Sequence, residues 1–269
     1  MTGDELPATV EAGGLLLTYE ERGKGDPIVL IHGTATDRSL WRETAAALEG
    51  AGRIVAYDRR GYGASQAPEP YGATTVEEQA EDAAALIEAL GAAPAVVCGH
   101  DLGAVICLDL LRRHADVTRA AVLVEPPLHS LSERGAEAVA QLREVIEAGA
   151  REGGPAGAVD AFVVETAGAN ALERLGDDRV GAARTAAGAF AADLVAAPSW
   201  QFGRRDLREL GAPVALLAGS RSAAIWGEIA KELGSLLGAA QPRWLDAGHL
   251  IPVEAPADVA RAVREMQAA

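Results

Sequence analysis

The sequence predicts an α/β fold built on a doubly wound, mostly parallel sheet, with an all-helical cap inserted into it. Short apolar runs alternate with amphipathic segments of helical spacing, which is typical of successive strand–helix units. Between residues 128 and 205 this alternation stops and only helical patterns remain. We therefore expect a core domain formed by residues 1–127 and 206–269, and a helical cap formed by residues 128–205.

The strands of the first half are predicted from apolar runs, most of them continuous enough to be buried on both faces of a parallel sheet. They span residues 15–21, 27–31, 53–57 and 120–124, and a further strand begins at Ala95 and runs into a turn that starts at Gly99. A helix is expected over residues 39–48, where apolar side chains have helical spacing. A longer one is expected from Thr75, a good capping residue, to Leu90, because Glu77 and Glu78 in its first turn complement the helix dipole.

The second half is predicted to contain the cap and the last part of the core. The cap helices are expected over residues 137–148, 156–167 and 179–195, with joints at 153–155 and at Pro198. The core then resumes with strands at 213–218 and 243–245 and helices at 223–237 and 256–266. In a doubly wound sheet, ligands bind at the carboxyl ends of the strands, where His32, Asp58, Asp101 and Glu125 are expected.

A sharp turn from strand to helix is predicted at Gly-His-Asp-Leu-Gly, residues 99–103. Such a turn strains the backbone at its tip, so small residues are needed on either side, and Gly99 and Gly103 provide them. The side chain of Asp101 would project above the sheet, beside the free N–H groups of a helix N-terminus. This is the layout of a nucleophile elbow with aspartate in place of the usual serine.

Composition limits the classes of partner. The formal net charge of −15 opposes binding to nucleic acid and to anionic membranes. We expect a cytoplasmic protein, because no apolar run is long enough to span a bilayer and residues 1–10 lack the pattern of a leader. Cys98 and Cys107 fall in predicted buried segments, where neither a disulfide nor a metal site is expected. The expected partner is a small apolar substrate, and the chain is expected to be a monomer or a homodimer.

Four motifs in one order resemble the α/β-hydrolase superfamily. They are His-Gly at 32–33, Asp-Arg-Arg-Gly-Tyr-Gly-Ala-Ser at 58–65, Gly-His-Asp-Leu-Gly at 99–103, and Gly-His at 248–249. Within that superfamily, an aspartate at the elbow resembles the haloalkane dehalogenases and the epoxide hydrolases. A carboxylate suits their chemistry, because it can displace a leaving group from an sp³ carbon and form an ester that water then hydrolyses.

The resemblance implies a role for each site residue and requires no cofactor. Asp101 would be the nucleophile and His249 the base that activates water, while the backbone N–H groups of Thr34 and Leu102 would form the oxyanion hole. The acid that orients His249 would be Glu125, because the common position after strand 213–218 has no carboxylate. Asp246 is the alternative.

The substrate pocket is predicted less specifically. Its expected lining residues are His32, Trp41, Phe162, Phe190, Trp200 and Leu250. His32 is also expected to shape the oxyanion loop, and Asp58 and Arg59 to brace the loops by a charge-assisted hydrogen bond. The tryptophan and tyrosine leaving-group donors usual in the two families are missing at their positions. A hydroxyl from the cap would have to serve, and the candidates are Thr166, Thr185 and Ser199.

Three functions remain open from the sequence. The first is hydrolysis through an Asp101 ester, with an epoxide favoured over an alkyl halide because ring opening needs no halide site. The second is a cofactor-free lyase, cyclase or oxygenase of specialised metabolism that uses Asp101 and His249 as acid and base. The third is a binding protein without catalysis, although a pocket used only for binding has no need of three ionisable groups.

Overall fold

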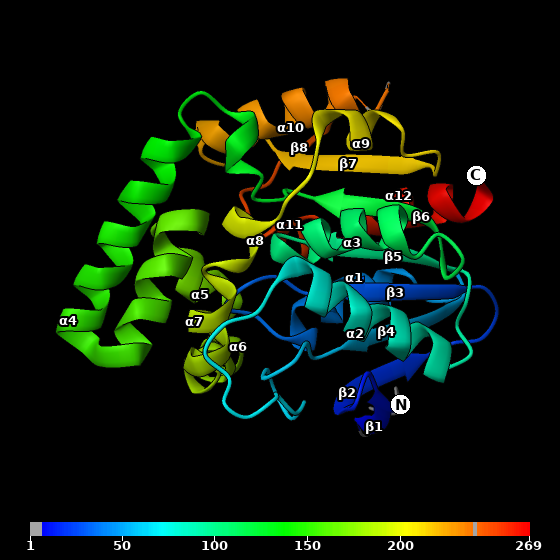
Figure 1. The fold of residues 1–269 in the computed structure, drawn as a ribbon, viewed down its shortest axis with the longest axis horizontal. Helices are drawn as coiled ribbons and strands as arrows, with labels where there is room; N and C mark the ends of the chain where they lie inside the picture. The colour runs from blue at the N-terminus through cyan, green and yellow to red at the C-terminus, as the bar shows by residue number, and fades with distance from the viewer. Residues whose placement is uncertain (1–6, 239–240) are drawn as a thin grey trace.

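The computed structural model describes residues 7–238 and 241–269 and contains an eight-stranded sheet (Figure 1). The strands are β1 (Ala8–Ala12), β2 (Leu15–Arg22), β3 (Pro27–Ile31), β4 (Arg53–Tyr57), β5 (Ala95–His100), β6 (Thr118–Val124), β7 (Val214–Gly219) and β8 (Arg243–Leu245). Their spatial order is β1-β2-β4-β3-β5-β6-β7-β8. The β1–β2 and β2–β4 pairs are antiparallel and the remaining pairs are parallel, which confirms the predicted mostly parallel, doubly wound sheet.

Strand β1 is the one described strand that the sequence analysis did not predict. It lies at the edge of the sheet and most of its side chains are exposed, so it lacks the apolar run that marks the central strands. Residues 1–6, part of the stretch inspected for a leader, lie outside the described residues.

Helices cover both faces of the sheet (Figure 1). One face packs against α2 (Val76–Ala89), α3 (Leu102–Arg113) and α10 (Ala224–Leu236). The other face packs against α1 (Arg42–Ala47), which follows the short 3-10 helix η1 (Arg38–Trp41), and against α12 (Pro256–Ala268). The Thr75 side chain caps α2 as predicted, and Glu78 returns the hydrogen bond to complete a capping box.

Between β6 and β7 the described chain is entirely helical. It contains η2 (His129–Leu131), α4 (Gly135–Ala167), α5 (Ala171–Leu175), α6 (Asp177–Thr185), α7 (Ala187–Asp193), α8 (Ala196–Ser199) and α9 (Arg204–Arg208). The last short helix before α12 is α11 (Ile251–Glu254). No single helix among the described residues is long and apolar enough to cross a membrane; Asp177–Thr185 and Ala187–Ser199 meet that test only as a pair, bent by 72°.

Helix α4 is a hairpin of two arms, because Gly154 adopts φ 63° and ψ −153° and Pro155 follows it. In Figure 1 the first arm descends along the left edge and the second returns beside it. The arms approach so closely that a Cβ atom on Gly149 would lie 2.4 Å from the carbonyl oxygen of Gly157. The predicted joint at residues 153–155 is therefore where the chain reverses.

Candidate active site

Asp101 lies at the tip of a strained turn between β5 and α3. Its φ of 51° and ψ of −124° fall outside the regions that L-residues favour. A Cβ atom on Gly99 would lie 2.1 Å from the carbonyl oxygen of Gly103, and one on Gly103 would lie 2.1 Å from that of Ile31. The turn therefore fits only with glycine at both positions.

The Asp101 carboxylate faces the loop that follows β3. The backbone N–H of Thr34 donates a hydrogen bond to its Oδ2 at 2.8 Å. Leu102 is the first residue of α3, so its N–H has no acceptor within the helix. The Thr34 N–H thus contacts the carboxylate, and the Leu102 N–H lies at the helix N-terminus that directly follows Asp101.

His249 lies between Asp101 and Glu125. Its Nδ1 is 2.7 Å from Oε2 of Glu125, and its Nε2 is 3.9 Å from Oδ1 of Asp101. The other carboxylate oxygen of Glu125 accepts from the backbone N–H of Gly219 at 2.7 Å, which fixes the carboxylate. Burial alone would lower the pKa of His249, but the hydrogen bond and charge of Glu125, with the charge of Asp101, outweigh it and raise that pKa.

Two aromatic side chains hold the His249 ring. Trp226 on α10 stacks on it, with ring centroids 4.2 Å apart and planes inclined by 22°. On β5, Nε2 of His100 lies 2.9 Å from the His249 carbonyl oxygen and donates to it. Burial and the neighbouring His249 lower the pKa of His100 to about 3, so His100 is neutral and braces the base rather than sharing its charge.

Glu254 on α11 holds the loop that carries His249. Its Oε2 accepts from the backbone N–H of Gly248 at 2.9 Å and from Arg221 at 2.8 Å. Arg174 on the inserted helix α5 lies 3.3 Å from its other oxygen. Glu254 therefore ties this loop both to the turn after β7 and to the helical insertion.

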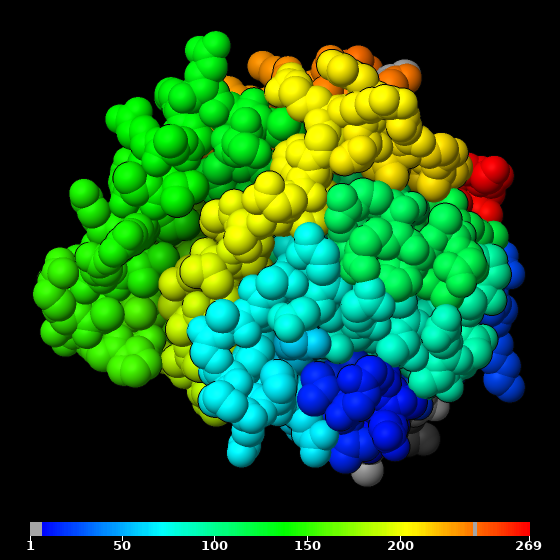
Figure 2. Space-filling view, viewed as in Figure 1, coloured from blue at the N-terminus to red at the C-terminus, as the bar shows by residue number. Residues whose placement is uncertain are grey.

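A cavity of about 420 Å³, here named the reactive cavity, opens above Asp101. Apolar side chains from both arms of α4 and from the segment around α8 form most of its wall. They include Val139, Leu142, Ile146, Phe162, Val195, Ala197 and Pro198. The space-filling view shows a furrow between the green surface of α4 and the yellow surface near α8 (Figure 2). The site is thus a mainly apolar chamber above Asp101, which His129, Arg143, Glu147 and Asp193 also line.

Phe162 is the one residue of the predicted pocket set that lines the reactive cavity. The other five residues predicted to line the pocket do not line the reactive cavity. His32, Trp41 and Leu250 are buried in the core, and Phe190 packs edge-on behind Phe162 with centroids 5.3 Å apart. The indole N–H of Trp200 donates to Asp109 at 3.0 Å. Its ring lines a neighbouring cavity that shares Pro127, His129, Val139, Ala197 and Pro198 with the reactive cavity.

His32 has a structural role instead. Its Nδ1 donates to the Gly33 carbonyl oxygen at 2.9 Å, and its Nε2 accepts from the Arg59 N–H at 3.0 Å. Asp58 and Arg59 do not pair with each other as predicted: Arg38 binds Asp58, and Asp193 binds Arg59. Both pairs brace loops at the carboxyl edge of the sheet, but through partners that sequence spacing did not indicate.

Several alternatives are resolved by position. The Asp246 side chain is 88% exposed and pairs with Arg221, so Glu125 and not Asp246 contacts His249. Of the three hydroxyl candidates only Thr166 lines the reactive cavity. All three hydroxyls donate to carbonyls of their own helices, that of Thr166 to Phe162 at 2.8 Å, so cavity position alone distinguishes Thr166. Within residues 7–238 and 241–269, no cluster of His, Cys, Asp or Glu is arranged to hold a metal ion, and both cysteines are buried and free.

Trp226 and the apolar face of α4 were not recognised as site residues from the sequence. A signal existed for α4, because Val139, Leu142 and Ile146 recur at three- and four-residue spacing on one helix face. Trp226 lies in the first turn of α10, directly after a strand end, where side chains reach the carboxyl edge of the sheet.

A buried carboxylate–imidazole–carboxylate chain beneath a helical insertion, with its tip residue on an elbow between strand and helix, is typical of hydrolases that share this α/β architecture. Comparison with known families supports this class. The chain belongs to the Alpha/beta hydrolase family, whose profile matches residues 28–262.

The curated relatives include a haloalkane dehalogenase and an epoxide hydrolase. A haloalkane dehalogenase of Agrobacterium fabrum is 37% identical over 123 residues, 45% of this chain and 40% of that protein. Epoxide hydrolase A of Mycobacterium tuberculosis is 36% identical over 121 residues, 44% of this chain and 38% of that protein. The match thus spans about two fifths of the length of these relatives.

Solved structures are similar over nearly the whole chain. A thermophilic esterase from Thermogutta terrifontis has a TM-score of 0.74 at 25% identity, covering 98% of both chains. An esterase from Exiguobacterium antarcticum has a TM-score of 0.80 at 18% identity, covering 97% of this chain and all of that one, and shows a shared fold.

Proposed function

We propose that this protein is a hydrolase in which Asp101 forms an alkyl ester with a small apolar electrophile, with an epoxide favoured over an alkyl halide. The observation that carries the proposal is the position of His249. Its ring contacts Glu125 at 2.7 Å on one side and lies 3.9 Å from Asp101 on the other. A base in that position can activate water beside an ester formed on Asp101.

In the first step a carboxylate oxygen of Asp101 attacks a ring carbon of the epoxide. A carbon–oxygen bond of the ring breaks, an ester forms, and the released alkoxide takes a proton from a donor in the cavity. Thr166 is a hydroxyl candidate that lines this cavity. An alkoxide needs only such a donor, whereas a halide needs a dedicated binding site, and this difference favours the epoxide.

In the second step His249 takes a proton from water, and the hydroxide attacks the ester carbonyl carbon of Asp101. The negative charge on the carbonyl oxygen would be stabilised by the N–H groups of Thr34 and Leu102. Collapse releases the alcohol oxygen, which receives the proton held by His249, and leaves Asp101 as a carboxylic acid. That acid gives its proton to the donor that protonated the alkoxide in the first step, which restores both the carboxylate and the donor. Glu125 stabilises the imidazolium formed in between.

The wall of the reactive cavity supports an apolar substrate. Most of its lining residues are aliphatic or aromatic, with Asp101, His129, Arg143, Glu147 and Asp193 as the ionisable ones, and its volume of about 420 Å³ suits a small organic molecule. A helical cap over this site, formed by residues 128–205, would exclude bulk water from the ester.

The proposal is tested with the variant His249→Gln and a pool of epoxides and alkyl halides. Without the base the ester cannot be hydrolysed, so it should accumulate. Intact-protein mass and the mass of the peptide containing Asp101 are measured. An adduct of the whole epoxide mass supports the proposal, while an adduct of a halide minus its halogen would reverse the preference for epoxide.

His114→Gln is the matched control, because His114 lies away from the site and pairs with Glu81. It should hydrolyse substrate without accumulating an adduct. Addition of Asp101→Asn to the His249→Gln variant should abolish the adduct. No adduct on the His249→Gln variant, with ligand binding retained, would contradict ester formation and favour acid–base chemistry by Asp101 and His249 without hydrolysis.

A further inference from the structure

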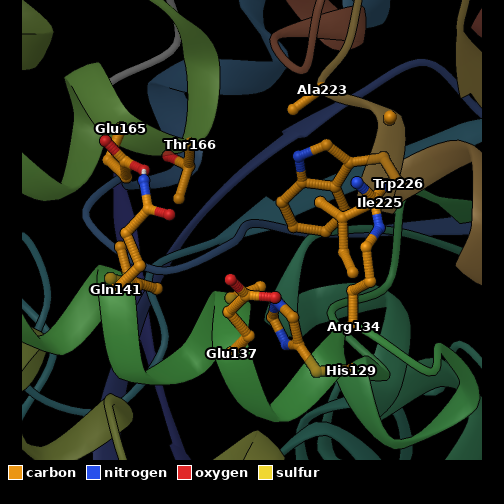
Figure 3. Close-up of a pocket in the computed structure, with 12 residues that line it drawn as sticks. His129, Arg134, Glu137, Gln141, Glu165, Thr166, Ala223, Ile225 and Trp226 are labelled. Carbon is orange, nitrogen blue, oxygen red and sulfur yellow. Dashed lines mark hydrogen bonds between the residues drawn. The ribbon is translucent and has the colours of Figure 1, made fainter.

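A second pocket, here named the side pocket, lies against the reactive cavity and has a volume of about 300 Å³ (Figure 3). Because the two pockets share four lining residues, they adjoin each other along one wall. The shared residues are His129, Leu142, Thr166 and Trp226. The side pocket is therefore one of two spaces that a molecule longer than the reactive cavity can enter from Asp101, the other being the cavity lined by Trp200.

The side pocket is polar where the reactive cavity is apolar. Gln141, Glu137 and Glu165 from the two arms of α4 face it in Figure 3. Gln141 donates to Glu165 at 2.8 Å, and Arg134 is engaged by Glu228 outside the pocket. Among the described residues Glu137 has no hydrogen-bond or ion-pair partner, so its carboxylate is free to accept a hydrogen bond.

The indole of Trp226 supplies an unused donor. The residue is only 4% exposed, and the indole N–H has no hydrogen-bond partner within residues 7–238 and 241–269. In Figure 3 the indole nitrogen is directed toward the interior of the side pocket, on the side where Thr166 lies. The indole nitrogen is not among the buried side-chain atoms that lack a partner, so it is accessible from the side pocket. The donor is therefore available to an acceptor on a molecule bound there.

His129 supplies an acceptor in the same wall. Its Nδ1 lies 3.0 Å from the Pro127 carbonyl oxygen and donates to it. Burial lowers the pKa of the ring, which keeps it neutral and leaves Nε2 as an acceptor. The ring centroids of His129 and Trp226 are 5.9 Å apart. Two neighbouring rings thus line the junction of the two cavities, one carrying a donor and the other an acceptor.

We propose that the side pocket is a binding site for a hydroxyl group, and that the substrate is an elongated apolar electrophile with a hydroxyl remote from the reacting carbon. A hydroxyl can accept from Trp226 and donate to His129 or Glu137. An ammonium group cannot accept the indole hydrogen bond, and a carboxylate would be repelled by Glu137 and Glu165. The assignment of substrate class rests on the proposed function, whereas binding of the hydroxyl does not.

The test uses n-alkanols and α,ω-alkanediols of matched chain length, which contain no electrophilic carbon. Their dissociation constants for the wild-type protein are measured by calorimetry. At one chain length the diol should bind roughly fivefold to tenfold more tightly than the alkanol, the ratio expected for one or two additional hydrogen bonds. If no side-pocket site exists, the alkanol should bind at least as tightly at every length, because an unpaired second hydroxyl is costly to bury. That result would overturn the proposal.

The variant Trp226→Phe keeps an aromatic ring beside His249 and removes the N–H. It should lose the preference for the diol, measured as the ratio of the alkanol and diol dissociation constants of the same variant, so that any change in the cavity that affects both ligands cancels. Trp244→Phe is the matched control, because Trp244 is 46% exposed on strand β8 and should leave the preference unchanged. Retention of the preference in Trp226→Phe would contradict the assigned donor.

The two proposals fail separately. If the His249→Gln variant forms no ester with any epoxide but the diol preference is present, the hydrolase mechanism is wrong and the hydroxyl site stands. If the ester forms and diols bind no better than alkanols, the mechanism stands and the hydroxyl site is wrong.

Discussion

Arg59, which follows β4, and Asp193, in the inserted helix α7, form an ion pair of 2.6 Å that is completely shielded from solvent. The same guanidinium donates to the carbonyl oxygens of His32 and Gly33, each at 2.9 Å. Those residues directly precede Thr34, whose N–H contacts Asp101. The pair therefore connects the helical insertion to the loop that positions the proposed oxyanion hole.

Asp193→Asn should destabilise the protein by about 3–5 kcal/mol, because it leaves the Arg59 charge buried without its counter-ion. Denaturant unfolding measures the loss. Asp160→Asn is the control, since its partner Arg184 is well exposed, and it should change stability far less. Equal effects of the two variants would show that burial of the Arg59–Asp193 pair does not increase its contribution to stability.

Glu125→Gln should slow ester hydrolysis by about 10²- to 10⁴-fold. The amide oxygen can still accept from Gly219, but the amide NH₂ then faces His249, which forces the wrong tautomer on the ring. Single-turnover rates on the purified variant measure this. Ester formation should be affected much less, so the ester should accumulate; an unchanged hydrolysis rate would exclude Glu125 as the orienting acid.

Ester hydrolysis should become faster as the pH rises, because only neutral His249 can take a proton from water. Because the pKa of His249 is raised, the midpoint of this rate increase should lie at a higher pH than for a histidine with an ordinary pKa. The groups that face His249 are Glu125, Asp101, His100, His129, Trp226 and Glu254. A pH profile of single-turnover hydrolysis measures the midpoint.

Glu254→Gln should move that midpoint to lower pH, because the Glu254 charge contributes to the raised pKa of His249. The amide oxygen can still accept from Gly248, so the fold of the loop is retained. Glu265→Gln, which removes a surface partner of Arg243, is the control and should leave the midpoint in place. A loss of activity without a shift of the midpoint would indicate a purely structural role for Glu254.

Gly103→Ala should destabilise the protein by about 1–3 kcal/mol or more, because the added Cβ would lie 2.1 Å from a backbone oxygen that cannot move away. Gly181→Ala is a useful contrast. Gly181 lies on the exposed face of α6 with nothing within 4 Å of an added Cβ, so alanine should stabilise the helix by about 1 kcal/mol. Thermal unfolding should show a lower melting temperature for Gly103→Ala and a higher one for Gly181→Ala than for the wild-type protein.

Much of the fold could be predicted because the central strands are buried on both faces and therefore appear as apolar runs. Predicted strands 27–31, 53–57 and 243–245 have the observed bounds. Helix α4 was anticipated as two segments because Gly153-Gly154-Pro155 cannot continue a helix. Edge strand β1 was missed because an exposed strand has no such apolar signal.

In the candidate site, the reacting groups could be predicted from the sequence and the pocket wall could not. Asp101, Glu125 and His249 follow strand ends, and parallel strands bring such positions together whatever the rest of the chain does. The pocket wall depends on how the inserted helices pack, which is set by contacts between distant segments. Trp41 and Leu250 are apolar and near the site in sequence, yet they point into the core.

The close approach of Gly149 and Gly157 has a consequence for how substrate range can change. The first arm of α4 contributes Leu142 and Ile146 to the reactive cavity, and the second contributes Phe162 and Thr166. One methyl group at either glycine would act as a wedge and push the arms apart, altering the width of the chamber without changing any residue in its wall. Selection for new substrates could therefore act on a hinge outside the chamber, leaving the reacting groups undisturbed.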